Sequence, residues 1–170
     1  MIDWAELYRE TCADLVRYLH RKVWDAERAR DLAQEVFARA LQHAARGHEP
    51  EHARAWLFSI AANLAKDEAR MVLRRKRHLT LLQGATQDAV QPDDSERIER
   101  AEREAAARAA LEQLGDRDCE VLLLWDAGLS YPEIAAQTGL AAGAIGTTLA
   151  RARRRLVEAH EALEARHVAR

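Results

Sequence analysis

The sequence predicts an all-α protein that consists of two small helical domains. Only 7 of the 170 residues are glycine and 3 are proline, while helix-favouring alanine, leucine, arginine and glutamate are abundant. Apolar residues recur three and four positions apart along most of the chain, as on one face of a helix. Residues 83–94, QGATQDAVQPDD, break this pattern with a polar, turn-prone stretch. We therefore expect a domain at 1–80, a short acidic linker at 81–94 and a second domain at 95–170.

Three helices, packed as a bundle, are expected in the first domain. The first spans about 3–22, and the second spans about 25–45 and ends at the breaker cluster RGHEP, residues 46–50. The third begins near Glu51 and continues to about His78. Its apolar residues at helical spacing predict a buried stripe: Ala53, Trp56, Leu57, Ile60, Ala61 and Leu64.

The second domain is expected to contain helices at 95–114 and 116–127, followed by a helix-turn-helix. Ser130 and Glu133 match a capping box, and Gly139 suits the left-handed conformation that ends a helix. The next helix has a predicted buried face: Ile145, Leu149, Ala152, Leu156 and Leu163. We expect the opposite face to be exposed: Ala144, Thr147, Thr148, Arg151, Arg154 and Arg155. A short polar end followed by arginines suits contact with base edges and then phosphates of DNA.

Charge is segregated along a chain whose net charge is only −2. Residues 51–80 contain seven Lys or Arg and three Asp or Glu, whereas residues 81–120 contain five and eleven. On the third helix, cations follow an amide at steps of three and four: Asn63, Lys66, Arg70, Arg74 and Arg77. Such a face can contact a base and follow a phosphate backbone. Two basic surfaces for nucleic acid, separated by an acidic connector, are therefore predicted.

Enzymatic chemistry is not predicted from this sequence. It shows no nucleophile motif, phosphate loop or metal cage, and Pro50 interrupts the histidine cluster at residues 43–52. We expect no cofactor and no metal. Cys12 and Cys119 lie far apart without Cys or His partners, which indicates free thiols in a reducing cytoplasm. No signal peptide and no apolar run of roughly 20 residues is visible, so neither membrane insertion nor export is expected.

Three segments, in this order, resemble the bacterial sigma-70 family: DLAQEVF, AWLFSIAANLAKDEAR, and LEQLGDRDCEVLLLWDAGLSYPEIAAQTG followed by RARRRL. More narrowly, the chain resembles the extracytoplasmic-function (ECF) sigma factors, which keep only regions 2 and 4. The resemblance implies an alternative sigma factor that binds core RNA polymerase and directs it to promoter DNA. It also implies an anti-sigma factor as a partner and a monomer when free. Domain 1–80 would be region 2, and domain 95–170 would be region 4.

The resemblance also implies site residues. Core polymerase would bind the outer strip of the second helix with its supporting residues: Asp31, Leu32, Gln34, Glu35 and Phe37. The minus-ten element would be recognised and melted by the loop at 45–52 and the third helix: Gly47, His48, Asn63, Lys66, Arg70, Arg74 and Arg77. The minus-thirty-five element would contact the helix-turn-helix: Ser130, Tyr131, Ala144, Thr147, Thr148, Arg151, Arg154 and Arg155.

Two departures from the family pattern are visible. The melting loop has no Phe, Tyr or Trp, so either His48 stacks on the flipped base or the pocket for this base has a different shape. The recognition helix has Gly146, Thr147 and Thr148 where basic or polar groups are common in the family, which favours readout of DNA shape and thymine methyl groups. Two other functions stay open at this point. One is a polymerase-independent helix-turn-helix regulator, and the other is a helical interaction protein without a DNA role.

Overall fold

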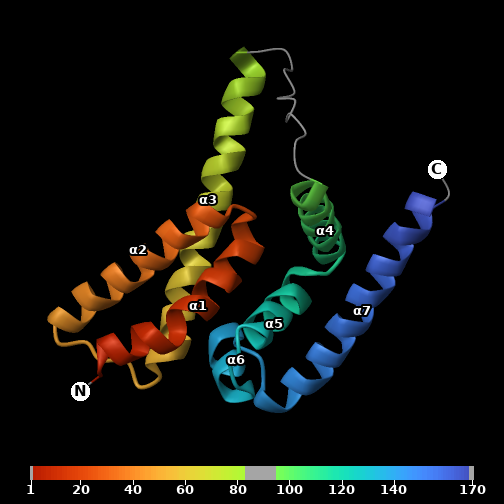
Figure 1. The fold of residues 1–170 in the computed structure, drawn as a ribbon. Helices are drawn as coiled ribbons and strands as arrows, with labels where there is room; N and C mark the ends of the chain where they lie inside the picture. The colour runs from red at the N-terminus through yellow and green to blue at the C-terminus, as the bar shows by residue number, and fades with distance from the viewer. Residues whose placement is uncertain (1, 83–94, 169–170) are drawn as a thin grey trace.

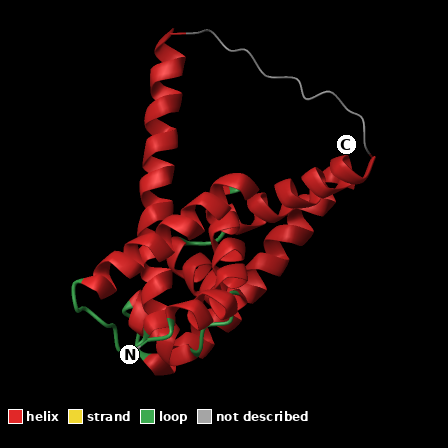
Figure 2. Cartoon of the chain, turned by 60° about the vertical axis from the view of Figure 1, so that its left-hand side comes forward, coloured by secondary structure: helices red, strands yellow, loops and turns green. Residues whose placement is uncertain are grey.

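The computed structural model describes residues 2–82 and 95–168, and every regular element within these ranges is an α-helix (Figure 1, Figure 2). The all-α prediction is confirmed. The first half contains α1 (Trp4–Val23), α2 (Ala26–Ala45) and α3 (Ala53–Leu82). The second half contains α4 (Ser95–Glu112), α5 (Asp116–Asp126), α6 (Tyr131–Thr138) and α7 (Ala142–Val168). Most of the predicted linker lies outside the described residues.

Local capping explains where the first helices begin and end. The Asp3 carboxylate accepts hydrogen bonds from the backbone N–H groups of Ala5 and Glu6, and Asp25 caps α2 in the same way. Between the two helices, Trp24 adopts a left-handed conformation with φ 55° and donates its N–H to the His20 carbonyl. These caps satisfy donors and acceptors that a helix leaves open at its ends.

Helices α1, α2 and α3 pack against one another around an apolar core. Leu57, Ala61 and Leu64 of the predicted stripe on α3 are buried, whereas Ala53, Trp56 and Ile60 are only half-buried. Phe58, which the predicted stripe omits, is fully buried and packs edge-on against Tyr18 with ring centroids 5.4 Å apart. The stripe is wider than predicted because α3 packs against α6 of the second half as well as against α1 and α2. Glu68 of α3 still pairs with Arg28 of α2 at 2.7 Å, and the C-terminal part of α3 then projects away from the bundle (Figure 1).

The second half is arranged around α7, which packs against α4, α5 and α6. The Glu133 carboxylate accepts hydrogen bonds from the Ser130 N–H at 2.8 Å and from its hydroxyl at 2.7 Å, which secures the start of α6. Gly139 ends α6 with φ 71°, as the sequence predicted. The core of this half consists of residues from all of α5, α6 and α7, among them Leu124, Ile134, Ile145, Leu149 and Ala152.

A buried carboxylate joins α5 to α7. The Asp118 side chain is only 4% exposed and accepts hydrogen bonds from Arg151 at 2.5 and 3.1 Å and from Arg155 at 2.9 Å. The hydrogen bonds and positive charges of Arg151 and Arg155 lower the pKa of Asp118, although burial acts in the opposite direction. The two arginines therefore stabilise an anion that would otherwise be costly to bury.

The two halves also pack against each other, through α1 with α5 and through α3 with α6. Their buried apolar residues form one continuous cluster rather than two separate cores. The sequence predicted two domains with a core in each, and it contained no signal for this contact. The contact arises from side chains on the flanks of amphipathic helices, which periodicity alone does not assign to a partner.

Replacement of Phe58 by alanine tests the packing of the first half. We expect Phe58→Ala to lower the free energy of unfolding by about 3–5 kcal/mol, because it removes a fully buried ring and leaves a cavity. Val72→Ala is the control on the same helix, since Val72 is 41% exposed and its loss should change stability by less than about 0.5 kcal/mol. Urea denaturation followed by circular dichroism measures both. Equal effects would contradict the described packing of α3.

Replacement of Asp118 by asparagine tests the α5–α7 contact and predicts a pH dependence. At pH 7, we expect Asp118→Asn to lower the free energy of unfolding by about 1–3 kcal/mol, since a neutral amide with only one acceptor oxygen replaces the carboxylate that Arg151 and Arg155 share. The pKa of Asp118 is lowered in the folded state, so its contribution is complete above the unfolded pKa of about 3.9 and is lost as the pH falls through the folded pKa. The difference between wild type and variant should therefore shrink below about pH 4. A difference that is constant from pH 7 to pH 3 would contradict this role.

Candidate nucleic-acid and protein interfaces

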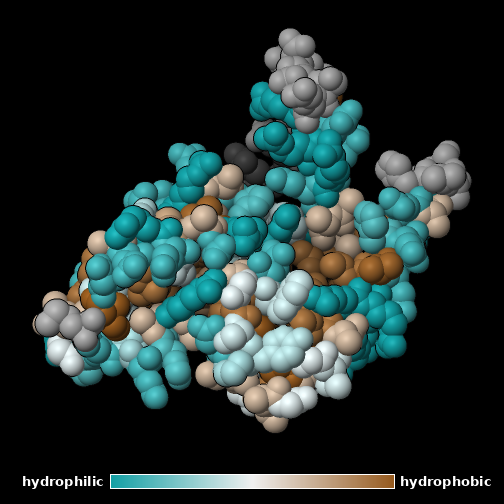
Figure 3. Space-filling view, turned by 60° about the horizontal axis from the view of Figure 1, so that its bottom comes forward, coloured by the Kyte–Doolittle hydropathy of each residue, from teal (hydrophilic) through white to brown (hydrophobic). Residues whose placement is uncertain are grey.

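The helix-turn-helix presents a small, weakly polar surface at the start of α7. Figure 3 brings the bottom of Figure 1 toward the viewer and shows pale colours of intermediate hydropathy where α6 and α7 begin. Ser130, Tyr131 and Thr147 are exposed there, and Ala144 is half-buried. The Thr147 hydroxyl donates a hydrogen bond to the Ala144 carbonyl at 3.0 Å, so its methyl group is left to contact a ligand. Groove contacts here would be mainly apolar and dependent on shape.

The prediction that Thr148 is exposed is wrong. Thr148 is only 5% exposed, and it precedes the buried Leu149. Because α7 packs against both α5 and α6 near this point, its buried arc is wider than the single stripe that the sequence indicated. Thr148 therefore lies among core contacts and not on a surface that could reach DNA.

The four arginines of α7 between residues 151 and 155 have different environments. Arg151 and Arg155 are half-exposed and both contact Asp118, as described above. Arg153, which the sequence analysis did not select, places its guanidinium 3.8 Å from the centroid of the Trp125 ring. Arg154 is 71% exposed, and its nearest acidic group is Glu158 on the next turn, 3.7 Å away. Arg154 is therefore more accessible to a phosphate than Arg151 or Arg155.

The basic face of α3 is on the surface, as predicted. Its residues are all exposed, and they continue from the bundle into the projecting part of the helix: Asn63, Lys66, Arg70, Arg74 and Arg77. Arg70 forms an exposed ion pair with Asp67 at 3.4 Å, and the Arg74 side chain donates a hydrogen bond to the Arg70 carbonyl at 3.4 Å. Exposed pairs of this kind contribute little to stability, so these side chains remain available to a polyanion.

Three aromatic rings gather beside the loop between α2 and α3. The His43 ring at the end of α2 lies edge-on to His48 of the loop, with centroids 5.3 Å apart, and to Trp56 of α3, with centroids 5.5 Å apart. Gly47, with φ 82°, makes the turn that brings His48 back toward α2. The sequence analysis selected His48 but treated Trp56 as core and left out His43. Their spacing along the chain carries no signal, because only the fold brings the three rings together.

The outer strip of α2 is exposed and acidic. Asp31 and Gln34 are exposed, while Leu32 is buried in the bundle as a support for them. Phe37 is also buried, with its ring edge-on to Tyr8 at a centroid distance of 4.7 Å. Glu35 accepts a hydrogen bond from Arg39 at 2.5 Å, a partner that the sequence analysis did not identify. The strip therefore combines a carboxylate that is partly neutralised with two polar groups that are free to dock against a protein.

Residues 2–82 and 95–168 contain neither a metal-ligand cluster nor a membrane-spanning helix. No group of three or more His, Cys, Asp or Glu side chains in these ranges could hold a metal ion. None of the helices described there combines the length and the apolar character required to cross a bilayer.

Comparison with known protein families gives one match in each half of the chain. The family described as Sigma-70 region 2 matches residues 7–77, and the family described as Sigma-70, region 4 matches residues 104–156. Among curated relatives, RNA polymerase sigma factor YlaC of Bacillus subtilis is 33% identical over 153 residues, which cover 87% of this chain and 86% of YlaC. ECF RNA polymerase sigma factor SigL of Mycobacterium tuberculosis is 34% identical over 147 residues, which cover 84% of this chain and 80% of SigL.

Solved structures show the same architecture. CnrH, in complex with the cytosolic domain of CnrY, superposes with a TM-score of 0.66 over 94% of this chain and 88% of the CnrH chain, at 26% identity. The sigma factor RpoE, in complex with the anti-sigma factor NepR from Bartonella quintana, gives a TM-score of 0.63 over 94% of this chain and 97% of the RpoE chain. Its identity of 23% indicates a common fold and nothing more.

The family matches cover both halves in the order region 2 and then region 4, and the curated relatives extend across most of the chain. A polymerase-independent regulator would need no region 2, and a helical protein without a DNA role would need neither region. The chain belongs to the sigma-70 family, as an ECF-type sigma factor that binds core RNA polymerase and promoter DNA and acts in transcription initiation without being an enzyme.

Proposed function

We propose that residues 1–80 bind core polymerase and open the minus-ten element, while residues 95–170 recognise the minus-thirty-five element. The observation that carries this assignment is the arrangement of the first half, where one bundle presents an acidic strip on α2 and a basic face on α3. A protein partner and a nucleic acid can then occupy the same bundle without competing for one surface. Such a factor would act in the cytoplasm, where the bacterial chromosome and polymerase are.

The minus-ten element would be read by the ring cluster and the first turns of the basic face. Removal of a base from the duplex stack costs a few kcal/mol, and stacking on aromatic side chains returns about 1–3 kcal/mol per base. His43, His48 and Trp56 offer such rings beside the loop, where the family usually has a loop aromatic. The Asn63 amide can form two hydrogen bonds with an adenine, and Arg70 and Arg74 can contact phosphates.

The minus-thirty-five element would contact the exposed end of the helix-turn-helix. Ser130, Tyr131 and Thr147 would face the groove, with the methyl groups of Ala144 and Thr147 near thymine. Arg154 would hold a phosphate directly. Arg151 and Arg155 share the Asp118 carboxylate, which orients them and reduces the positive charge that they present to DNA. Sequence discrimination would therefore rely on DNA shape more than on hydrogen bonds to base edges.

An anti-sigma factor is proposed as a further partner. A factor that redirects polymerase must be kept inactive until its signal arrives, and the solved relative CnrH forms a complex with another protein, the cytosolic domain of CnrY. A partner of this kind could cover the acidic strip of α2, the basic face of α3 or the helix-turn-helix. A partner that covers any one of these surfaces would be sufficient to prevent transcription initiation.

Charge reversal at Glu35 tests the proposed polymerase surface. We expect Glu35→Arg to keep the fold, because this side chain is partly exposed, and to weaken binding to core polymerase on the order of ten-fold. The change removes an acceptor and places two cations, residue 35 and Arg39, side by side on the strip. Glu10→Arg on the exposed face of α1 is the matched control and should bind normally. Gel filtration with core polymerase, without DNA, measures both, and unchanged affinity of folded Glu35→Arg would reject this surface.

Replacement of Asn63 tests whether this residue contacts a DNA base or only the DNA phosphate backbone. We expect Asn63→Ala to slow promoter opening by about 10–100-fold while duplex binding by the holoenzyme changes less than three-fold, because one adenine contact contributes about 1–3 kcal/mol. Opening can be followed by the fluorescence of 2-aminopurine placed in the minus-ten element.

Lys66→Ala is the comparison variant on the same face. It should weaken binding about equally on all promoter sequences and lower the salt dependence, as expected for a phosphate contact. An Asn63→Ala variant that behaves in the same way as Lys66→Ala would mean that Asn63 does not contact a base.

A further inference from the structure

The exposed start of α7 offers DNA almost no side chain that can form a hydrogen bond with a base edge. Residues 141–147 read AAGAIGT, in which Thr147 has the one polar side chain. Its hydroxyl already donates to the Ala144 carbonyl at 3.0 Å, and one turn later Arg151 is held by Asp118. A recognition helix contacts base edges mainly through its N-terminal residues. A hydrogen bond to a base here therefore needs a group from outside α7.

Tyr131, the first residue of α6, places its ring against this part of α7. A Cβ built at Gly146 would lie 3.6 Å from Cε2 of Tyr131, which is an ordinary van der Waals distance. Cε2 is bonded to the ring carbon that carries the hydroxyl, so the hydroxyl end of the ring lies beside the recognition helix. The ring thus lies next to the position where α7 has no side chain.

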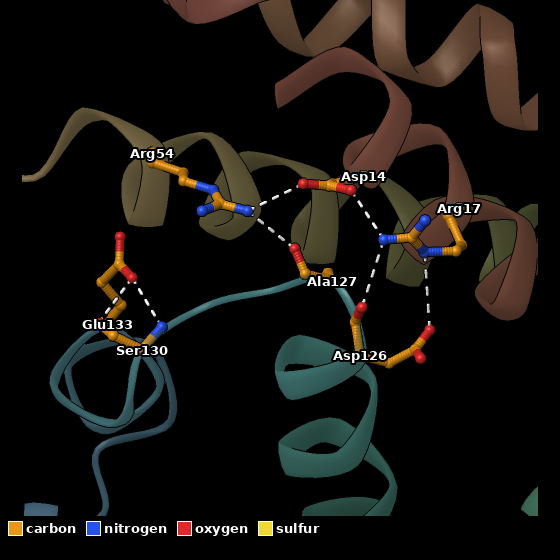
Figure 4. Close-up of polar contacts among 7 residues, drawn as sticks. All are labelled: Asp14, Arg17, Arg54, Asp126, Ala127, Ser130 and Glu133. Carbon is orange, nitrogen blue, oxygen red and sulfur yellow. Dashed lines mark hydrogen bonds and ion pairs between the residues drawn. The ribbon is translucent and has the colours of Figure 1, made fainter. Parts of the chain in front are cut away.

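The Tyr131 hydroxyl is available to a ligand. The residue is 44% exposed, and no group within residues 2–82 and 95–168 forms a hydrogen bond with this hydroxyl. The other hydroxyls of the proposed minus-thirty-five surface are engaged or buried. Besides Thr147, the Ser130 hydroxyl donates to the Glu133 carboxylate at 2.7 Å (Figure 4), and Thr148 is buried. Of these four hydroxyl groups, that of Tyr131 remains to bind a base.

The backbone of Tyr131 is fixed on both sides. On one side, the N–H and the hydroxyl of Ser130 both bind the Glu133 carboxylate, as Figure 4 shows. On the other side, the ring of Pro132 restricts the backbone. A tyrosine has only two side-chain torsions to order, so it loses little conformational entropy when it contacts a partner. Tyr131 is therefore preorganised for contact with DNA.

We propose that Tyr131 is a specificity-determining residue for the minus-thirty-five element, because its hydroxyl binds one base edge in the major groove from a ring that lies against Gly146. This inference rests on the proposed assignment of that element to residues 95–170. A phenolic hydroxyl both donates and accepts, so it can bind N7 or O6 of guanine, O4 of thymine, or the amino group of adenine or cytosine. DNA shape then sets the preference across the element, and Tyr131 adds discrimination at one base pair.

Gly146 belongs to the same arrangement. The first atom of any side chain at this position would already touch the Tyr131 ring, so the further atoms of a long side chain must pass beside the ring or displace it. Glycine inside a helix is unfavourable because it loses more backbone freedom on folding than other residues. What Gly146 gives in return is room for the ring at the surface that enters the groove.

The test uses the full chain with core polymerase and a library of promoters that differ only in the minus-thirty-five element. Sequencing of bound and free DNA gives the preference at each base pair. We expect Tyr131→Phe to reduce discrimination at one base pair by about three- to ten-fold, as for the loss of one hydrogen bond, and to leave the other positions within about two-fold. Tyr8→Phe is the matched control, since Tyr8 is 45% exposed and lies on α1.

Two results with folded Tyr131→Phe would overturn the inference. One is a set of preferences that is unchanged at every position. The other is an equal loss of affinity for all sequences, because this is the behaviour of a phosphate contact rather than of a base contact.

A second substitution tests the role of Gly146. We expect Gly146→Lys to change the preferred base at the position that Tyr131 reads. When lysine stands at position 146, Tyr131→Phe should alter discrimination by less than about two-fold, since the two residues act as one unit. A full effect of Tyr131→Phe in the Gly146→Lys chain would mean that the ring acts independently of position 146, which overturns the arrangement.

Arg154→Ala separates failure of this inference from failure of the assignment on which it rests. If α6 and α7 contact the element, Arg154→Ala should weaken binding about equally on all sequences and reduce the dependence on salt. That result, together with no effect of Tyr131→Phe, overturns the inference alone. If binding depends neither on the sequence of the element nor on Arg154, the inference and the assignment both fail.

Discussion

The structure depends on one constraint, which is that each helix must bury a single apolar face. In the first half this burial places Leu32 and Phe58 inside the bundle and so turns Glu35 and Asn63 outward on two different sides. Both binding surfaces consist of the side chains that stay exposed after the core has formed. Replacement of an apolar core residue would therefore disturb both surfaces, because it changes the orientation of the helices, although the residue itself contacts neither partner.

Charges in the second half serve both stability and recognition. Asp118 holds Arg151 and Arg155 against α5, while Arg153 lies over Trp125 and Arg154 points to solvent. A run of arginines that looks uniform in sequence is thus divided into residues that orient the recognition helix and one that is accessible to a phosphate. The buried carboxylate also lowers the local positive charge, so DNA binding by this half alone should be weak and should depend less on salt than four free arginines would predict.

The contact between the halves links these two surfaces. Tyr18 packs its ring against Phe58 in the first core and donates its hydroxyl to Glu120 of the second half, so one side chain takes part in both. Arg17, Lys22 and Arg54 of the first half also form hydrogen bonds and ion pairs with α5 and the residue that follows it.

Helix content, the helix-turn-helix with its capping box at Ser130 and the exposed basic face from Asn63 to Arg77 could be predicted from the sequence, because periodicity and capping are local properties of the chain. The same rule failed at Thr148, since its burial depends on two neighbouring helices. The ring cluster of His43, His48 and Trp56 and the contacts of Arg54 with Asp14 and Ala127 join residues that are distant in sequence. Only the tertiary structure decided them, because the direction in which each helix packs is set by the whole core rather than by the helix itself.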